Sequence, residues 1–330
     1  MQLRSAIQGI LAVLTLAALS TCTPALAQES GSKPEIPSAP GASPGPKFPA
    51  VDPKNFTASS PTRETVEAFL HVSWGYDTDR VWQVQAIQKT PAPGVSKVTA
   101  LVAQKSDPQQ QVATLVFNVT PDGKHLISNN EVLPFGATPY TDARRILSER
   151  ADGPSRGAAD KRYEFVEFAD LQCPHCKAVQ PTIERLLSDF PQAHFVFENL
   201  PLTAIHTEAY KAATYGMCVA QQSGNDAFFK FIDAVFAAQD GLTPQTSDAT
   251  LADAVTKIGL DPGKVGSCSY TSAAKAPVDA SMKLAQDLDV IETPMLFING
   301  RQIPVGEAAN GQLPYDMLKK IVAWQFSLDQ

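Results

Sequence analysis

Hydrophobic and polar positions follow two different periods along the first half of this chain of 330 residues. In PTRETVEAFLHVSW, which begins at residue 61, apolar residues recur at helical spacing. The three runs that follow, VWQVQAI, SKVTALVAQ and QVATLVFNVT, alternate apolar and polar residues with period two, which is typical of strands. Asp122-Gly123 comes after the third run and indicates a hairpin turn. Residues 61–150 are therefore predicted to form a small α+β domain with an antiparallel sheet.

The second half changes to an alternation of strands and helices. RYEFVEFA predicts a buried strand, and KAVQPTIERLLSDF predicts a helix that Pro181 should kink. AHFVFENL predicts a second strand, and MLFING with RQIPVG predicts a hairpin around Asn299-Gly300. Between these strands lies a helical pattern at about residues 202–288, and a last helix ends the chain. The fold class predicted for residues 162–330 is α/β, a thioredoxin fold with an inserted helical domain, preceded by the small α+β domain.

The first residues have the pattern of a secretory signal. Arg4 gives a positive start, an apolar run follows, and a small-x-small sequence ends at Ala27, so residues 1–27 are expected to be removed and the mature chain to begin at Gln28. The apolar run is too short to span a membrane comfortably. LSTC, which ends at Cys22, loosely resembles a lipoprotein box, but its threonine is atypical, so cleavage is favoured over lipid anchoring.

Two segments have the composition of linkers. Residues 28–60 are rich in Pro, Ser and Gly and nearly free of large aliphatic residues, which predicts a disordered spacer. Residues 151–161, ADGPSRGAADK, are expected to form a short linker.

Composition and the signal sequence together limit the location and the partners. Loss of Arg4 leaves 26 basic against 34 acidic side chains, a net charge of −8. This balance gives no obvious affinity for nucleic acid or for an anionic membrane surface. Export places the chain in the periplasm or outside the cell, where disulfides persist.

The candidate chemistry lies in CPHC, residues 173–176, between the first predicted strand and its helix. A zinc site needs about four ligands, and only His175 lies near Cys173 and Cys176, so no metal is expected. A structural bridge between residues this close would close a very short loop and add little stability. Redox exchange fits best, because the N-terminal N–H groups and the dipole of a helix stabilise a thiolate at Cys173.

A stabilised thiolate makes the disulfide an oxidant, because it favours the reduced form. Pro174 sets the backbone around the sulfur, and His175 can donate to the thiolate or carry positive charge beside it. Cys176, one helical turn on, is placed to resolve a mixed disulfide by attacking Cys173. No dissociable cofactor is implied.

FADLQCPHC, together with Thr293-Pro294 before MLFING, resembles the DsbA-like thiol-disulfide oxidoreductases of the thioredoxin superfamily. The resemblance implies that Cys173 is the exposed nucleophile and Cys176 the buried resolving thiol. It implies a cis bond at Pro294 and a backbone at Thr293 that faces an extended substrate segment. It also implies that Glu167 is a buried acid that moves the proton of Cys176.

The other residues that stand out have structural interpretations. Four cysteines of the mature chain allow three pairings, and sequence alone does not choose among them. Our hypothesis is a structural disulfide between Cys218 and Cys268, which both fall in the helical insertion. His71 is interpreted as a packed or surface residue, and His206 as structural. Four aromatic residues at helical spacing are interpreted as core residues and not as a substrate groove: Phe228, Phe229, Phe231 and Trp324.

The sequence therefore predicts a periplasmic protein thiol-disulfide oxidoreductase that donates the Cys173–Cys176 disulfide to reduced or misoxidised exported proteins. The family resemblance implies a membrane partner, linked to quinone, that reoxidises it. One alternative is a disulfide isomerase or reductase that is a homodimer through residues 61–150, because TPDGKHLI resembles the dimerisation modules of isomerases such as DsbC and Thr293 replaces the valine of strong oxidases. Another is a non-catalytic thioredoxin-fold chaperone or binding protein.

Overall fold

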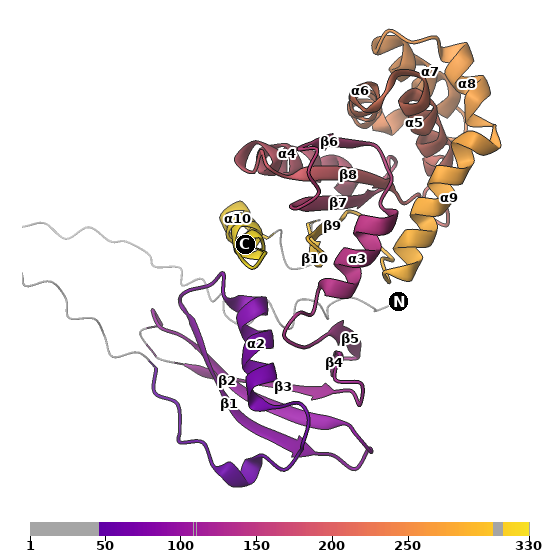
Figure 1. The fold of residues 1–330 in the computed structure, drawn as a ribbon. Helices are drawn as coiled ribbons and strands as arrows, with labels where there is room; N and C mark the ends of the chain where they lie inside the picture. Colours follow the sequence, from indigo (N-terminus) through magenta and orange to yellow (C-terminus); the bar gives the residue numbers. More distant parts are fainter. Residues whose placement is uncertain (1–45, 108, 110, 306–312, 330) are drawn as a thin grey trace, which may run out of the picture. The chain divides into compact units, whose positions relative to one another are not determined.

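The computed structural model describes residues 46–329 except 108, 110 and 306–312 (Figure 1). The expected signal segment with Cys22, and residues 28–45 of the expected spacer, lie outside the described residues. The chain divides into two compact units, Met1–Ala137 and Thr138–Gln330.

The first unit is an antiparallel sheet covered on one face by a helix. The strands follow one another in the order β1-β2-β3-β4-β5. The helix is α2, Arg63–Trp74, and the side-chain oxygen of Thr62 caps it by accepting from the Thr65 N–H at 3.2 Å. The strands are β1 Arg80–Lys89, β2 Ser96–Gln104, β3 Val112–Val119, β4 His125–Ser128 and β5 Glu131–Pro134.

The core of this unit lies between α2 and one face of the sheet. Phe69 of α2 packs against Phe117 and Phe135, with ring centroids 6.1 and 4.9 Å apart. The turn expected at Asp122-Gly123 joins β3 to β4, and Gly123 adopts a φ of +67° that glycine tolerates without strain. The other face exposes four apolar side chains: Val112, Val116, Ile127 and Val132.

The described end of the expected spacer differs from the expectation of disorder. Pro53–Asn55 forms a short 3-10 helix, η1, capped by Asp52. The N–H groups of Thr57 and Ala58 both donate to the Ile87 carbonyl of β1, at 3.0 and 3.1 Å. These bonds to an edge strand order the segment although it has few large apolar residues.

The second unit is a five-stranded mixed sheet in the order β10-β9-β7-β8-β6. β7 is parallel to β8, and the other pairs are antiparallel. The strands are β6 Ser155–Gly157, β7 Glu164–Ala169, β8 His194–Asn199, β9 Met295–Ile298 and β10 Arg301–Pro304. Four helices flank the sheet: α3 Thr141–Arg150, α4 Pro174–Asp189, α9 Ser272–Asp287 and α10 Tyr315–Ser327.

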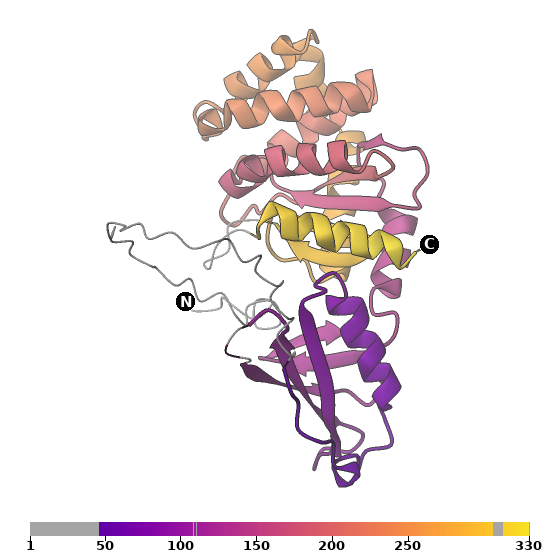
Figure 2. The same cartoon turned by 90° about the vertical axis from the view of Figure 1, so that its left-hand side faces the viewer.

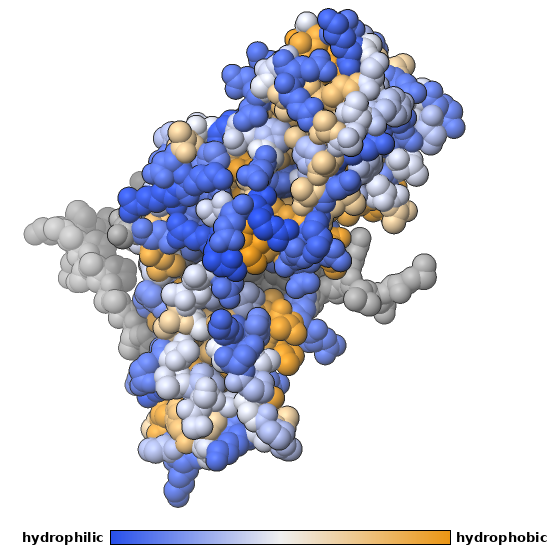
Figure 3. All heavy atoms as spheres, turned by 45° about the vertical axis from the view of Figure 1, so that its right-hand side comes forward, coloured by the Kyte–Doolittle hydropathy of each residue, from blue (hydrophilic) through white to orange (hydrophobic). Residues whose placement is uncertain are grey.

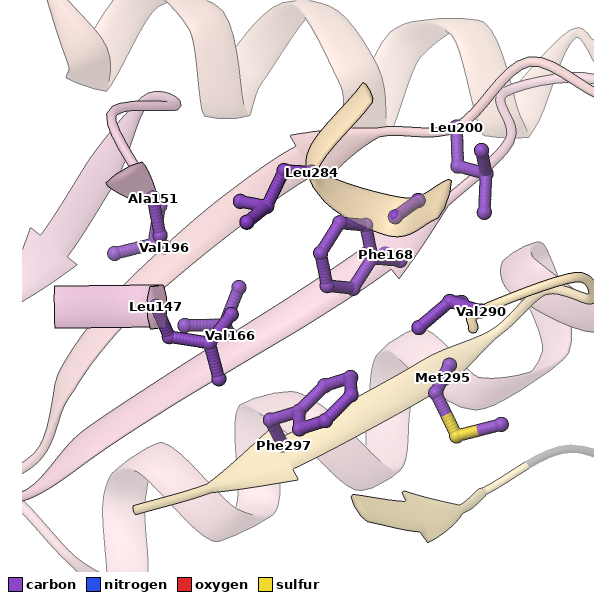
Figure 4. Packing of buried hydrophobic residues seen from close by; sticks show 11 residues of the cluster. Leu147, Ala151, Val166, Phe168, Val196, Leu200, Leu284, Val290, Met295 and Phe297 are labelled. Carbon is purple, nitrogen blue, oxygen red and sulfur yellow. The ribbon is translucent and has the colours of Figure 1, made fainter. Parts of the chain in front are cut away.

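The helices cover both faces of this sheet. α4 and α10 lie on one face and α3 and α9 on the other (Figure 2). On the α10 side, Phe326 stacks on Phe165 of β7 with centroids 5.6 Å apart. On the other side, Figure 4 shows Leu147 of α3 beside Val166 of β7 and Leu284 of α9 near Phe168 of the same strand. This layered order is the α/β thioredoxin fold expected from the sequence, and α4 continues through Pro181.

The boundary between the units differs from the expected one. The sequence pattern places residues 141–150 in the first domain and 151–161 in a linker, but both segments belong to the second unit. Leu147 and Ala151 are buried in its core, and β6 pairs with β8 along Ser155↔Val196. The sequence pattern missed this because a helix with one buried leucine and a three-residue edge strand give almost no periodic signal.

The helical insertion lies between β8 and β9. Cys218 and Cys268 form a disulfide that joins α5 to α8 and closes a sequence separation of 50 residues. The inserted helices before α9 are α5 Ala209–Ser223, α6 Asn225–Ala237, η2 Gln239–Gly241, α7 Ser247–Lys257 and α8 Pro262–Ser269.

The surface drawn in Figure 3 is largely hydrophilic, with separate hydrophobic areas between charged and polar residues. Within the described residues, no helix has the length and apolar character needed to cross a membrane.

Candidate active site

The two cysteines of CPHC stand where β7 gives way to α4. Cys173 is the N-cap residue of α4, Pro174 occupies its first turn, and Cys176 follows within that turn. Both thiols are free and buried, with Cys173 4% and Cys176 0% exposed. Cys173 is therefore less exposed than the family resemblance implied. Its Sγ lies 3.7 Å from the carbonyl oxygen of Thr293, which covers it.

The surroundings of Cys173 favour its thiolate. A hydrogen bond from the Cys176 thiol is the largest cause, and the backbone N–H groups of Cys176 and His175 and a contact with Thr293 add to it. Together they lower the pKa of Cys173 to about 5 against the opposing effect of burial. The His175 side chain is exposed, and the backbone of this residue, not its ring, lowers the pKa of Cys173.

Cys176 has the opposite electrostatics. Burial, and the interaction with Cys173, raise its pKa well above the ordinary value. The backbone N–H of Asp170 donates to its Sγ at 3.3 Å and only partly offsets this effect. The pair is thus divided into one thiol that ionises readily and one that keeps its proton.

Thr293 and Pro294 lie beside the pair because of the strand register. Pro294 immediately precedes β9, and the first residue of β9, Met295, pairs with Phe168 near the end of β7. The Thr293–Pro294 peptide bond is cis. The backbone of Thr293 consequently faces Cys173, the sulfur that the family resemblance makes the nucleophile.

Glu167 is a fully buried carboxyl on β7, 0% exposed. Burial is the main cause that raises its pKa to about 7, although the Gln180 side chain donates to Oε1 at 3.0 Å and favours the charged form. The same Gln180 amide donates to the carbonyl of Cys176 at 3.0 Å. Gln180 therefore connects the carboxyl to the turn that holds the resolving cysteine.

Sequence reasoning did not identify Gln180, Asp170 or the role of His206. The position of Gln180, four residues after Cys176, was the available signal, because it places the amide one turn further on the same side of α4. The Asp170 carboxylate accepts from the Leu202 N–H at 2.8 Å and contacts His206 Nδ1 at 2.8 Å. His206, read as structural, thus anchors the loop that precedes Cys173.

The remaining residues singled out in the sequence belong to other elements. His71 lies on α2 of the first unit, and the phenylalanines of α6 are buried in the helical insertion. Glu198, another carboxyl whose pKa burial raises to about 7, accepts from Ser281 and from the Gly153 N–H. Its strand partner is Phe168, so it lies on the sheet face opposite Glu167. The described residues contain no cluster of three or more metal-ligating side chains.

Comparison with known proteins decides the family. The profile of the family described as Thioredoxin matches residues 149–323, more than half of the chain. The chain belongs to the thioredoxin family. The matched region contains β7, α4, the helical insertion and β9, so the family and the strand order agree on the fold.

Curated relatives match over a shorter stretch. The Na(+)/H(+) antiporter NhaA 3 of Salinispora tropica is 31% identical over 153 residues, which are 44% of this chain and 22% of that protein. The Na(+)/H(+) antiporter NhaA 1 of Salinispora arenicola is 29% identical over the same length. The chain spans about a fifth of the length of these curated relatives.

Three solved structures illustrate the similarity of this chain to known folds. The catalytic domain of Proteus mirabilis ScsC is 22% identical, covering 56% of this chain and 98% of that one, with a TM-score of 0.45. The thiol-disulfide exchange protein alpha-DsbA2 of Wolbachia pipientis is 24% identical, covering 55% and 95%, with a TM-score of 0.46. BdbD of Bacillus subtilis is 22% identical, covering 53% and 93%, with a TM-score of 0.46.

Proposed function

We propose that this protein is a thiol-disulfide oxidoreductase that exchanges the Cys173–Cys176 disulfide with cysteines of other proteins. The observation that supports this most is the opposite effect of the site on its two thiols. One sulfur has a pKa lowered to about 5, and the other has a pKa raised well above its ordinary value. Disulfide exchange proceeds through attack by a thiolate, and a thiol of low pKa is also the better leaving group.

In the proposed reaction a substrate thiolate attacks Cys173 Sγ of the oxidised pair. The intramolecular S–S bond breaks, a mixed disulfide forms at Cys173, and Cys176 leaves as a thiolate that takes up a proton. A second substrate thiolate then attacks the substrate sulfur of the mixed disulfide and releases Cys173 as a thiolate. Two electrons pass from the substrate dithiol to the pair, and the substrate leaves with its disulfide.

Glu167 is suited to supply and remove the proton at Cys176. A pKa of about 7 leaves the carboxyl partly protonated near neutral pH, which is where a general acid and base works best. Gln180 bonds both the carboxyl and the Cys176 carbonyl, so the two groups belong to one hydrogen-bonded set. We assign Glu167 a proton-transfer role on this basis.

Substrate segments would approach along the backbone of Thr293. Ile291 is 85% exposed in the loop before Thr293, and Ile205 is 70% exposed in the loop after β8. Both loops lie at the end of the sheet where β7 ends, because Ala169 pairs with Asn199 and Phe168 with Met295. Exposed apolar side chains near a thiol pair suit unfolded chains whose cysteines are not yet paired.

The lowered pKa of Cys173 favours donation of disulfides over reduction, because it stabilises the reduced form of the enzyme. We place this activity in the periplasm or outside the cell, on reduced or misoxidised exported proteins. A membrane redox partner would take the two electrons from the reduced pair. The first unit would hold clients, or a second copy of the chain if the activity is isomerisation.

Cysteine variants test the proposal directly. Cys173→Ser should abolish oxidation of a reduced, unfolded substrate protein. Cys176→Ser, incubated with a substrate protein that carries a disulfide, should accumulate a mixed disulfide, because the Cys173 thiolate attacks that disulfide, releases one substrate thiolate and has no partner thiol to resolve the product. Nonreducing electrophoresis and intact mass detect this species. Cys218→Ser/Cys268→Ser, which removes only the distant disulfide, is the matched control and should keep exchange activity. Unchanged substrate oxidation by Cys173→Ser would overturn the proposal. A wild-type protein that oxidises no substrate, but binds unfolded proteins as well as Cys173→Ser does, would favour a non-catalytic binding protein.

A further inference from the structure

The helical insertion reaches the backbone of the active-site loop through a buried amide. Gln239, 8% exposed, is the first residue of η2, between α6 and α7. Its Nε2 donates to the carbonyl oxygens of Leu171 and Cys173, both at 2.9 Å. One side chain of the insertion thus binds the two carbonyl groups on either side of Gln172.

The Cys173 carbonyl has a second role as the N-cap acceptor of α4. It accepts the first intrahelical bond, from the Lys177 N–H at 3.2 Å. The N–H of Cys173 in turn donates to the Asp170 carbonyl at 3.0 Å. Gln239 therefore acts on the peptide group that fixes how the first turn of α4 is oriented.

A second amide makes the same connection from the loop side. Gln172 donates through Nε2 to the Leu242 carbonyl at 2.8 Å and accepts through Oε1 from the Glu208 N–H at 2.9 Å. Leu242 follows η2, and Glu208 is the N-cap residue of α5. The loop is thus bound to two separate parts of the insertion.

We propose that Gln239 is a positioning residue for Cys173, through which the helical insertion holds residues 171–173 so that the N–H groups of His175 and Cys176 point at Cys173 Sγ. The proposal rests on the exchange function assigned to Cys173. The insertion then helps to stabilise the Cys173 thiolate as well as the fold.

The physical argument concerns buried acceptors. Without the Gln239 amide, the Leu171 carbonyl loses a donor and the Cys173 carbonyl keeps only the weaker bond from Lys177. A buried acceptor left unsatisfied is destabilising, so the loop shifts to find another donor. The shift moves the first turn of α4 away from the geometry in which the N–H groups of Cys176 and His175 stabilise the thiolate.

Gln239→Met is the test variant, because methionine fills a similar volume and has no N–H group to donate. Gln221→Met is the matched control: Gln221 also lies in the insertion and its amide also donates to a backbone carbonyl, that of Ala273 at 2.8 Å, but not to the active-site loop. The measurements are the thiolate absorbance of Cys173 against pH and the equilibrium of the pair with glutathione. Thermal unfolding of each variant shows that it is folded.

Gln239→Met should shift the glutathione equilibrium about threefold to tenfold toward the disulfide, as the loss of one net hydrogen bond implies, and should raise the pH at which the thiolate forms. Gln221→Met should change neither. If Gln239→Met matches the wild type within twofold in both measurements, the positioning role is wrong. If Gln239→Met does not fold, Gln172→Met, which frees the loop from Leu242 and Glu208, must show the same shift or the inference fails.

Failure of this inference is distinct from failure of the proposed function. A wild-type protein that exchanges disulfides, with a Gln239→Met variant identical to it, overturns only the positioning role. A wild-type protein whose Cys173 neither ionises at low pH nor forms mixed disulfides overturns the proposed function itself.

Discussion

The pKa of Cys173 predicts a change of slope in the reduction potential as pH is varied. Below a pKa of about 5 both sulfurs of the reduced pair carry protons, so two protons accompany two electrons. Above it Cys173 is a thiolate while Cys176 keeps its proton, so one proton accompanies two electrons. The potential should fall by about 59 mV per pH unit below the break and by about 30 mV per pH unit above it.

The sign follows from linkage. Because the pKa of Cys173 is lowered, its ionisation stabilises the reduced form only above about pH 5. This stabilisation grows until pH reaches the free thiol value near 8.5 and is lost as pH falls back through about 5. At pH 7, about two units above this pKa, ionisation favours the reduced form by at most about a hundredfold, which is roughly 3 kcal/mol or about 60 mV for two electrons.

The assay equilibrates the protein with a series of glutathione ratios at each pH from about 4 to about 8, traps the thiols with an alkylating reagent, and measures the oxidised fraction by mass. Cys218→Ser/Cys268→Ser serves as a control that the distant disulfide does not contribute to the signal. A single slope near 59 mV per pH unit over the whole range would refute the assignment of a thiolate at Cys173, because it would mean that both sulfurs stay protonated.

Three further outcomes follow from particular residues. Glu167→Gln should slow substrate oxidation by about tenfold or more and flatten the pH profile of the rate near pH 7, and an unchanged profile would contradict the proton-transfer role. The same variant should stabilise the fold at pH 8 by up to roughly 3 kcal/mol, because burial raises the pKa of Glu167 to about 7 and the buried carboxylate is disfavoured above that pH. Removal of the Cys218–Cys268 disulfide should lower the free energy of unfolding, measured with denaturant, by roughly 4 kcal/mol, because the bridge closes a loop of 50 residues, and exchange activity should be kept. A loss below about 1 kcal/mol would show that the unfolded chain is already constrained without the bridge. Gly300→Ala should lower stability by about 2 to 4 kcal/mol, because φ is +82° and a Cβ would meet the Tyr140 carbonyl; equal melting temperatures would contradict this packing.

The local patterns of this sequence were strong where elements are long and periodic. The three alternating runs became β1, β2 and β3, and the turn at Asp122-Gly123 joined β3 to β4. In the second unit, the predicted order of strand, helix, strand, insertion and hairpin matched the observed order. Weak signals failed at the boundary, where α3 and β6 joined the second sheet because Leu147 and Ala151 are buried there.

The site shows the same division between sequence and tertiary structure. Spacing placed Cys173 at a helix N-terminus, and chemistry then required a stabilised thiolate, both of which depend only on neighbours along the chain. Thr293 covers Cys173, and Gln239 binds the carbonyl groups of Leu171 and Cys173. These contacts join residues separated by up to 120 positions. Such contacts have no periodic trace in the sequence.

What the sequence by itself determined is the set of elements and the nature of the reactive pair, because helical and strand periods, turn residues and CPHC are local. Only the tertiary structure decided how far the two thiols differ, that Gln180 connects Glu167 to the turn of Cys176, and that the insertion binds the active-site loop. Burial and hydrogen-bond geometry set these properties, and both arise when strands and helices distant in sequence pack together.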